Sequence, residues 1–141
     1  IEAKKERWDI SIRCVGLLNE LVEGTDAKIV ISSTWRYGLS IEEITQRLVE
    51  CDFKYPESII DVTPRMTSVG ILRGNEILQW MKNNSALVGG YYEFSSYVIL
   101  DDDSDMLYWQ KDNFLIVDGY CGLTPSIVYK AKFILNQKYE R

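Results

Sequence analysis

The sequence contains no histidine among its 141 residues. This absence excludes Ser-His and Cys-His nucleophilic systems and the imidazole ligands used by most zinc sites. The chemistry that remains is that of carboxylates, hydroxyls, Lys and Arg. Any metal bound by this chain would therefore have oxygen ligands.

Cysteine, long apolar runs and positive charge are also scarce. The chain has three cysteines, Cys14, Cys51 and Cys121, and no Cys-x-x-Cys pair, which favours reduced thiols and a cytoplasmic location. No apolar run approaches the roughly 20 residues that span a bilayer, so we expect no membrane partner. The net charge of -5, with Lys and Arg dispersed, argues against broad attraction to nucleic acid but leaves room for a small basic pocket.

The composition of the chain and the spacing of its apolar residues predict one α/β domain over residues 1–141. A content of 46% hydrophobic residues at this length fits a single core. Apolar spacing predicts a helix from a cap at Asp9 to about Gly24, and Ser40 with Glu43 forms a capping box for a second helix. The further elements expected are apolar strands over 28–31, 97–100 and 114–117, a β-like run over 58–62, a helix over 75–83, and a helix over 125–135 capped by Thr124.

The three apolar strands do not alternate polar and apolar residues, and each lies beside a helix in the sequence. This pattern is typical of right-handed crossovers around a parallel sheet. Ligands bind such sheets beyond the carboxyl ends of the strands. The polar groups at these ends are Ser32-Ser33-Thr34, Asp101-Asp102-Asp103 and Asp118, and we expect them to meet at one rim.

Four carboxylates fall within positions 101–105, directly after the strand over 97–100. Carboxylates this close repel one another unless a cation or solvent separates them. The cluster is therefore either a hard-metal site or a solvated acidic loop. The hydroxyls that follow the first strand are likewise either strand-end caps or ligand-binding groups, and composition alone leaves both interpretations open.

Taken in order, five stretches resemble successive landmarks of the haloacid dehalogenase (HAD) superfamily. They are similar to the small phosphatase-like domains of Swiss-army-knife RNA-repair proteins. The stretches are residues 29–36, Thr63-Pro64, residues 73–77, residues 97–103 and residues 122–124. The resemblance implies a Rossmann-like, HAD-type three-layer sandwich around a central, mainly parallel sheet.

The resemblance also implies an activity, a cofactor and a set of site residues. The activity is magnesium-dependent hydrolysis of phosphate monoesters through an aspartyl-phosphate, on a phosphorylated small molecule or the 5′ or 3′ terminal phosphate of a nucleic acid. The implied catalytic residues are Ser32, Ser33 and Arg73, the phosphate- or substrate-binding residues are Thr34, Trp35 and Arg36, and the ligands of Mg2+ are Asp101, Asp102 and Asp105. Ser33 is the alternative to Ser32, and Lys82 is the substitute for Arg73.

Two of these residues also suit their roles on physical grounds. Arg36 offers a bidentate phosphate contact, and Trp35 offers a surface on which a base or sugar can stack. Phosphoryl transfer places negative charge on three equatorial oxygens, so catalysis depends on positioning and on neutralisation by cations and hydrogen-bond donors.

One landmark of the superfamily is missing. Its first strand ends in Asp-x-Asp, where the first Asp attacks phosphorus and the second acts as acid and base, and no such strand precedes Asp9. The stretch Ile116-Val117-Asp118-Gly119 has Ile where the first Asp is needed. We therefore expect the nucleophile in a segment preceding Ile1. Two other functions compete with this interpretation: a non-catalytic HAD-like binding or assembly module, and a carboxylate-metal nuclease.

Overall fold

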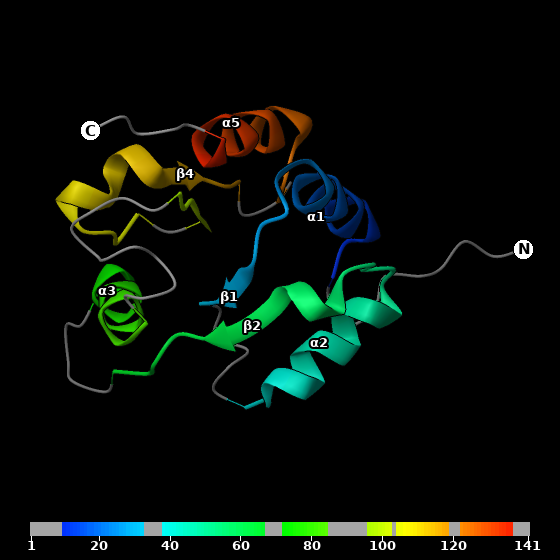
Figure 1. The fold of residues 1–141 in the computed structure, drawn as a ribbon, viewed down its shortest axis with the longest axis horizontal. Helices are drawn as coiled ribbons and strands as arrows, with labels where there is room; N and C mark the ends of the chain where they lie inside the picture. Colours follow the sequence, from blue (N-terminus) through cyan, green and yellow to red (C-terminus); the bar gives the residue numbers. More distant parts are fainter. Residues whose placement is uncertain are drawn as a thin grey trace, which may run out of the picture.

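The structure, a computed structural model, describes residues 10–32, 38–66, 72–84, 96–102, 104–118 and 122–136. Helices and strands alternate along the chain, which confirms the mixed α/β class (Figure 1). The elements are α1 (Ile12–Thr25), β1 (Ile29–Ile31), α2 (Ile41–Glu50), η2 (Pro56–Ser58), β2 (Ile59–Val62), α3 (Arg73–Asn83), β3 (Ile99–Asp101), η3 (Tyr108–Asn113), β4 (Phe114–Ile116) and α5 (Pro125–Leu135). None of the described helices is long and apolar enough to cross a membrane.

The strands form two parallel pairs. β1 pairs with β2, with an irregularity in register between Ile29 and Val30. β3 pairs with β4 in an even register that sets Ile99 opposite Phe114. Parallel pairing is therefore confirmed within each pair, and among the described residues the pairs are separate two-stranded sheets.

Local capping signals determine where α1, α2 and α5 begin. The capping box of α2 is confirmed, because the Ser40 hydroxyl accepts a hydrogen bond from the Glu43 N–H and the Glu43 carboxylate accepts one from the Ser40 N–H, both at 3.1 Å. Thr124 caps α5, with Pro125 in the first turn, as predicted. The predicted cap of α1 at Asp9 is wrong. Ser11 caps that helix instead, because its extended backbone lets its hydroxyl accept a hydrogen bond from the N–H of Cys14.

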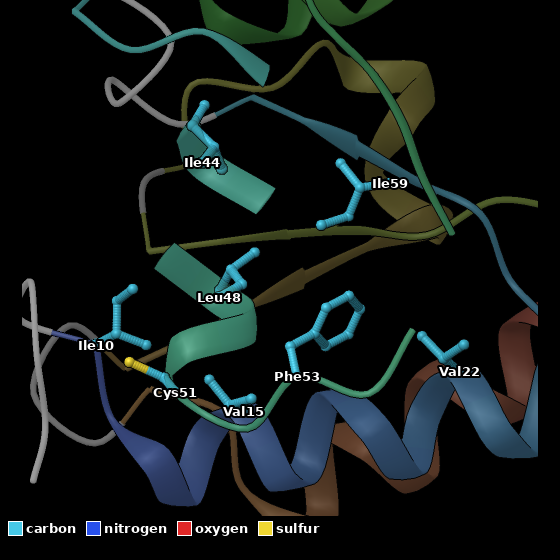
Figure 2. Packing of buried hydrophobic residues seen from close by; sticks show 8 residues of the cluster. All are labelled: Ile10, Val15, Val22, Ile44, Leu48, Cys51, Phe53 and Ile59. Atoms are coloured by element: carbon cyan, nitrogen blue, oxygen red, sulfur yellow. The ribbon is translucent and has the colours of Figure 1, made fainter. Parts of the chain in front are cut away.

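Two apolar clusters hold the elements together, and α1 contributes to both. The first lies among α1, α2 and β2, where side chains from all three elements meet (Figure 2). Its buried members are Ile10, Val15, Val22, Ile44, Leu48, Cys51, Phe53 and Ile59. The second joins α1 to α5, which lie side by side in Figure 1, through Leu17, Leu21, Val128 and Ala131. Since Leu100 and Leu115 pack against this second cluster, α1 connects both strand pairs.

Candidate functional site

A cavity of about 1120 Å³ is lined by residues of both strand pairs. β1 and β3 each contribute all three of their residues to its wall, and α1 and α3 contribute apolar side chains. Several polar residues that follow the strands also line it: Ser32, Asp102 and Asp118. The structure thus brings together, at one cavity, the described polar residues from the carboxyl ends of β1, β3 and β4.

Arg73 connects the carboxyl ends of β1 and β3. Its guanidinium Nε lies 3.3 Å from Oδ2 of Asp101, the last residue of β3. The Nη1 of the same guanidinium donates a hydrogen bond to the backbone carbonyl of Ser32, directly after β1. The Arg73 and Asp101 side chains are 18% and 9% exposed, so this ion pair is shielded from solvent but still open to the cavity.

Arg73 is the first residue of α3, although the helix was predicted to begin two residues later, at Asn75. Its N-cap, Leu72, has no side chain that can cap the helix. The missing cap comes from Asp105, whose Oδ2 accepts a hydrogen bond from the Arg73 N–H at 2.9 Å and whose backbone carbonyl accepts one from the Gly74 N–H at 3.1 Å. A carboxylate also complements the positive end of the helix dipole. Asp105 therefore fixes the backbone of the residue whose guanidinium enters the cavity.

The segment after Asp105 is in turn held against α3. Gln110 is fully buried, donates a hydrogen bond to the Gly74 carbonyl at 3.1 Å, and accepts one from the Leu107 N–H at 2.8 Å. Position 74 has no room for a side chain, because a β-carbon there would lie 2.6 Å from the Leu107 nitrogen. This close approach keeps Asp105 within reach of the helix.

The acidic residues differ in their surroundings. Asp101 is engaged with Arg73, Asp102 is exposed at the cavity, and Asp105 caps α3. Within the described part of the chain, no group of three or more His, Cys, Asp or Glu side chains is placed to hold a metal ion. Among the described residues of the acidic cluster, Asp101 and Asp102 can thus offer carboxylate oxygens at the cavity.

The remaining predicted site residues fall into two groups. Ser33, Thr34, Trp35 and Arg36 are outside the described residues, as is Asp103. Lys82, the substitute considered for Arg73, is exposed in the last turn of α3 and does not line the cavity.

Thr63 is a further polar residue at the cavity, and the sequence patterns indicated no role for it. It directly follows β2, lines the cavity, and is only 4% exposed. The only sequence signal for a role of this residue was its position in the Thr63-Pro64 stretch. A hydroxyl that follows a strand does not by itself indicate which residues will surround it in the fold.

Polar residues thus line a cavity beyond the carboxyl ends of parallel strands, which is where α/β domains commonly bind ligands. Residues 2–128 match the family described as the HAD domain in Swiss Army Knife RNA repair proteins. The match covers most of the chain, so the chain belongs to this family of HAD domains. Comparisons with curated proteins and with solved structures gave no significant match.

Proposed function

We propose that this domain is the larger part of a magnesium-dependent phosphatase acting on terminal 5′ or 3′ phosphates of nucleic acids. The observation that carries the proposal is the position of Arg73, which joins Ser32 to Asp101 at the cavity. A cation, a hydroxyl and carboxylates at one site are the groups that phosphoryl transfer requires. Membership of a family of RNA repair proteins supports a nucleic-acid substrate.

Arg73 neutralises the transferring phosphoryl group in this proposal, and the Ser32 hydroxyl donates a hydrogen bond to it. The planar guanidinium matches phosphate oxygens in geometry and can form two parallel hydrogen bonds with them. Its existing contacts with the Ser32 carbonyl and Asp101 favour a fixed position before substrate arrives. Such preorganisation is the main source of electrostatic catalysis.

The four residues after Ser32 would extend the substrate contacts. In this proposal Ser33 is the alternative hydrogen-bond donor to Ser32, and Thr34 adds a second hydroxyl. Arg36 adds a bidentate phosphate contact, and Trp35 stacks on the terminal base or sugar.

Magnesium fits the donors at this site. Asp101 and Asp102 offer the hard oxygen ligands that Mg2+ prefers, and this ion commonly takes only one or two carboxylates from the protein and keeps several waters. When bound, it would supply positive charge to the phosphoryl oxygens. Asp105 supports the site by holding α3, because its Oδ2 is already bonded to the Arg73 N–H.

We further propose that the two strand pairs belong to one central sheet of a three-layer sandwich. The cavity is lined by Val30 of β1 and Leu100 of β3, and both residues are only half-buried. Strands of parallel sheets are normally covered on both faces and paired on both edges, except at the ends of the sheet. A further strand between β1 and β3 would cover these side chains and pair with both edges.

This further strand is also the place for the nucleophile. In the proposal, a preceding segment supplies the strand and ends it with Asp-x-Asp at the same rim as Asp101. The first of these Asp residues attacks phosphorus and releases the alcohol of the substrate, and water then hydrolyses the aspartyl-phosphate to give inorganic phosphate.

The test is phosphate release by the full-length protein from 5′- and 3′-phosphorylated oligonucleotides, with and without Mg2+. We expect release to require Mg2+ and to fall about 10²–10³-fold in kcat/KM for Arg73→Ala, the typical effect of removing one electrostatic contact to the transition state. Lys82→Ala removes a cation from the same helix at an exposed position and should keep wild-type activity. Thermal unfolding of both variants checks that the fold is intact.

Two outcomes would replace the proposal. If no phosphate is released from any ester although Asp-x-Asp is present upstream, the domain is a non-catalytic module. If internal phosphodiesters are cleaved, and the Asp101→Asn, Asp102→Asn double variant loses this cleavage, the domain is a carboxylate-metal nuclease.

A further inference from the structure

A second cavity, of about 510 Å³, lies at the carboxyl end of β2. Thr63 and Trp80 line both this cavity and the larger one, so the two spaces share a wall. Its volume is in the range of small-ligand sites. The Thr63-Pro64 stretch, which resembles a HAD landmark, lines this cavity, but the resemblance assigned no role to it.

Thr63 is the polar residue at the junction. Its N–H donates a hydrogen bond to the Ile31 carbonyl at 2.8 Å, which continues the pairing of β1 with β2 and sets Thr63 beside the end of β1. Its hydroxyl is buried and has no hydrogen-bond partner among the described residues. A buried hydroxyl without a partner is costly to the folded protein, and a ligand at the junction of the cavities could supply the partner.

Two other polar residues of the second cavity, Asp61 and Asn84, are held in place by hydrogen bonds. Oδ2 of Asp61 accepts a hydrogen bond from the Trp80 indole at 2.8 Å, and the Asn84 amide donates one to the Trp80 carbonyl at 2.9 Å. The charges of Asp61 and Arg65, which also lines the cavity, offset each other. The cavity therefore suits a neutral group rich in hydrogen-bonding atoms better than a second phosphate.

On the basis of the proposed phosphatase function, we propose that this second cavity binds the terminal nucleoside of the substrate, on the leaving-group side of the reacting phosphate. The Thr63 hydroxyl bonds to the sugar oxygen nearest the phosphate, where the two cavities meet. Asp61 and Asn84 offer an acceptor and a donor to the sugar hydroxyls or the base edge. The cavity would make the enzyme prefer nucleotides over simple phosphate esters.

The kinetic test compares Thr63→Val and Thr63→Ser in the full-length protein. The substrates are a nucleoside monophosphate and phenyl phosphate, which has no sugar. We expect Thr63→Val to lower the ratio of the two kcat/KM values about 5–20-fold, the effect of one lost hydrogen bond, and Thr63→Ser to retain most of the ratio. Thr45→Val is the matched control, because its hydroxyl donates a hydrogen bond to the Ile41 carbonyl within α2 and Thr45 lines neither cavity.

A binding test separates this inference from the phosphatase proposal. The probe is adenosine, a nucleoside without phosphate, and the signal is the Trp80 indole N–H resonance, assigned with Trp80→Phe. We expect adenosine to shift this resonance in the wild type and to bind about 5–20-fold more weakly to Thr63→Val.

Each result decides between the two proposals. No shift at millimolar adenosine, or an unchanged kcat/KM ratio in Thr63→Val, overturns the nucleoside subsite. If adenosine shifts the resonance but neither ester is hydrolysed, the phosphatase proposal fails and the subsite stands.

Discussion

Arg73 is anchored through both its backbone and its side chain. Its N–H bonds Asp105, and its guanidinium contacts the Ser32 carbonyl and Asp101. A flexible cation would lose conformational entropy on binding phosphate, whereas an anchored one has lost most of it during folding. The net contribution of Arg73 to the free energy of folding therefore depends on how far these contacts compensate for the conformational entropy that its side chain loses during folding.

The pairing of Arg73 with Asp101 can be measured by a double-mutant cycle. Urea unfolding of the wild type, Arg73→Met, Asp101→Asn and the double variant should give a coupling energy of about 1–3 kcal/mol, above the usual range for exposed ion pairs because both side chains are largely buried. The coupling should persist at high salt, since screening acts mainly on exposed charges. A coupling near zero would show that Arg73 is held by its other contacts alone.

At the scale of elements, the beginning of α3 depends on the contact between Gly74 and the segment after Asp105. Gly74→Ala should destabilise the protein by about 1–3 kcal/mol, because the new methyl group would overlap the Leu107 backbone, which cannot move aside as a flexible side chain can. Gly16→Ala is the matched control. It lies in α1 with open space around it, and should stabilise the protein by about 0.5–1 kcal/mol.

Urea unfolding measures the stability of both glycine variants, and phosphate release measures the effect of each substitution on the activity of the site. If Gly74→Ala unfolded at the same urea concentration as Gly16→Ala, the close approach of Gly74 to Leu107 would be refuted.

The capping box of α2 makes stability depend on pH. Hydrogen bonds from the Ser40 backbone and side chain lower the pKa of Glu43 from its ordinary value of 4.5. Because the folded-state pKa is the lower one, the charged carboxylate stabilises the folded protein at neutral pH, and this contribution is lost as pH falls through the folded-state pKa. Unfolding of wild type and Glu43→Gln should therefore differ at neutral pH and converge in acid. If the difference in unfolding free energy between wild type and Glu43→Gln stayed constant down to about pH 3, the stabilisation would come from packing and not from the charge of Glu43.

At the scale of the whole molecule, β1 and β3 both line the large cavity. If a preceding strand fills it, hydrogen exchange at Val30 and Leu100 should be slower in the full-length protein than in residues 1–141 alone. The urea midpoint should also rise, since more apolar surface is buried. The amides within α2 report on a region away from this cavity and serve as the internal reference. Equal exchange of β1 and β3 in both chains would show that the cavity remains open.

The sequence by itself determined the order of helices and strands and the caps at Ser40 and Thr124. These features depend on residues within about four positions of one another, so local patterns contain them. It also determined which polar residues follow the strands, because an apolar run that ends in hydroxyls or carboxylates is visible without any structure.

Only the tertiary structure decided where α3 begins and which residues meet at the cavity. The Arg73 N–H and Asp105 are 32 positions apart, and the Arg73 guanidinium and the Ser32 carbonyl are 41 apart. Such contacts form only when packing brings separate elements together, as α1 does for the two strand pairs. The sequence showed that Thr63 belongs to a stretch that resembles a HAD landmark. Only the structure showed that Thr63 is buried where two cavities meet, and the proposed role of its hydroxyl rests on that position.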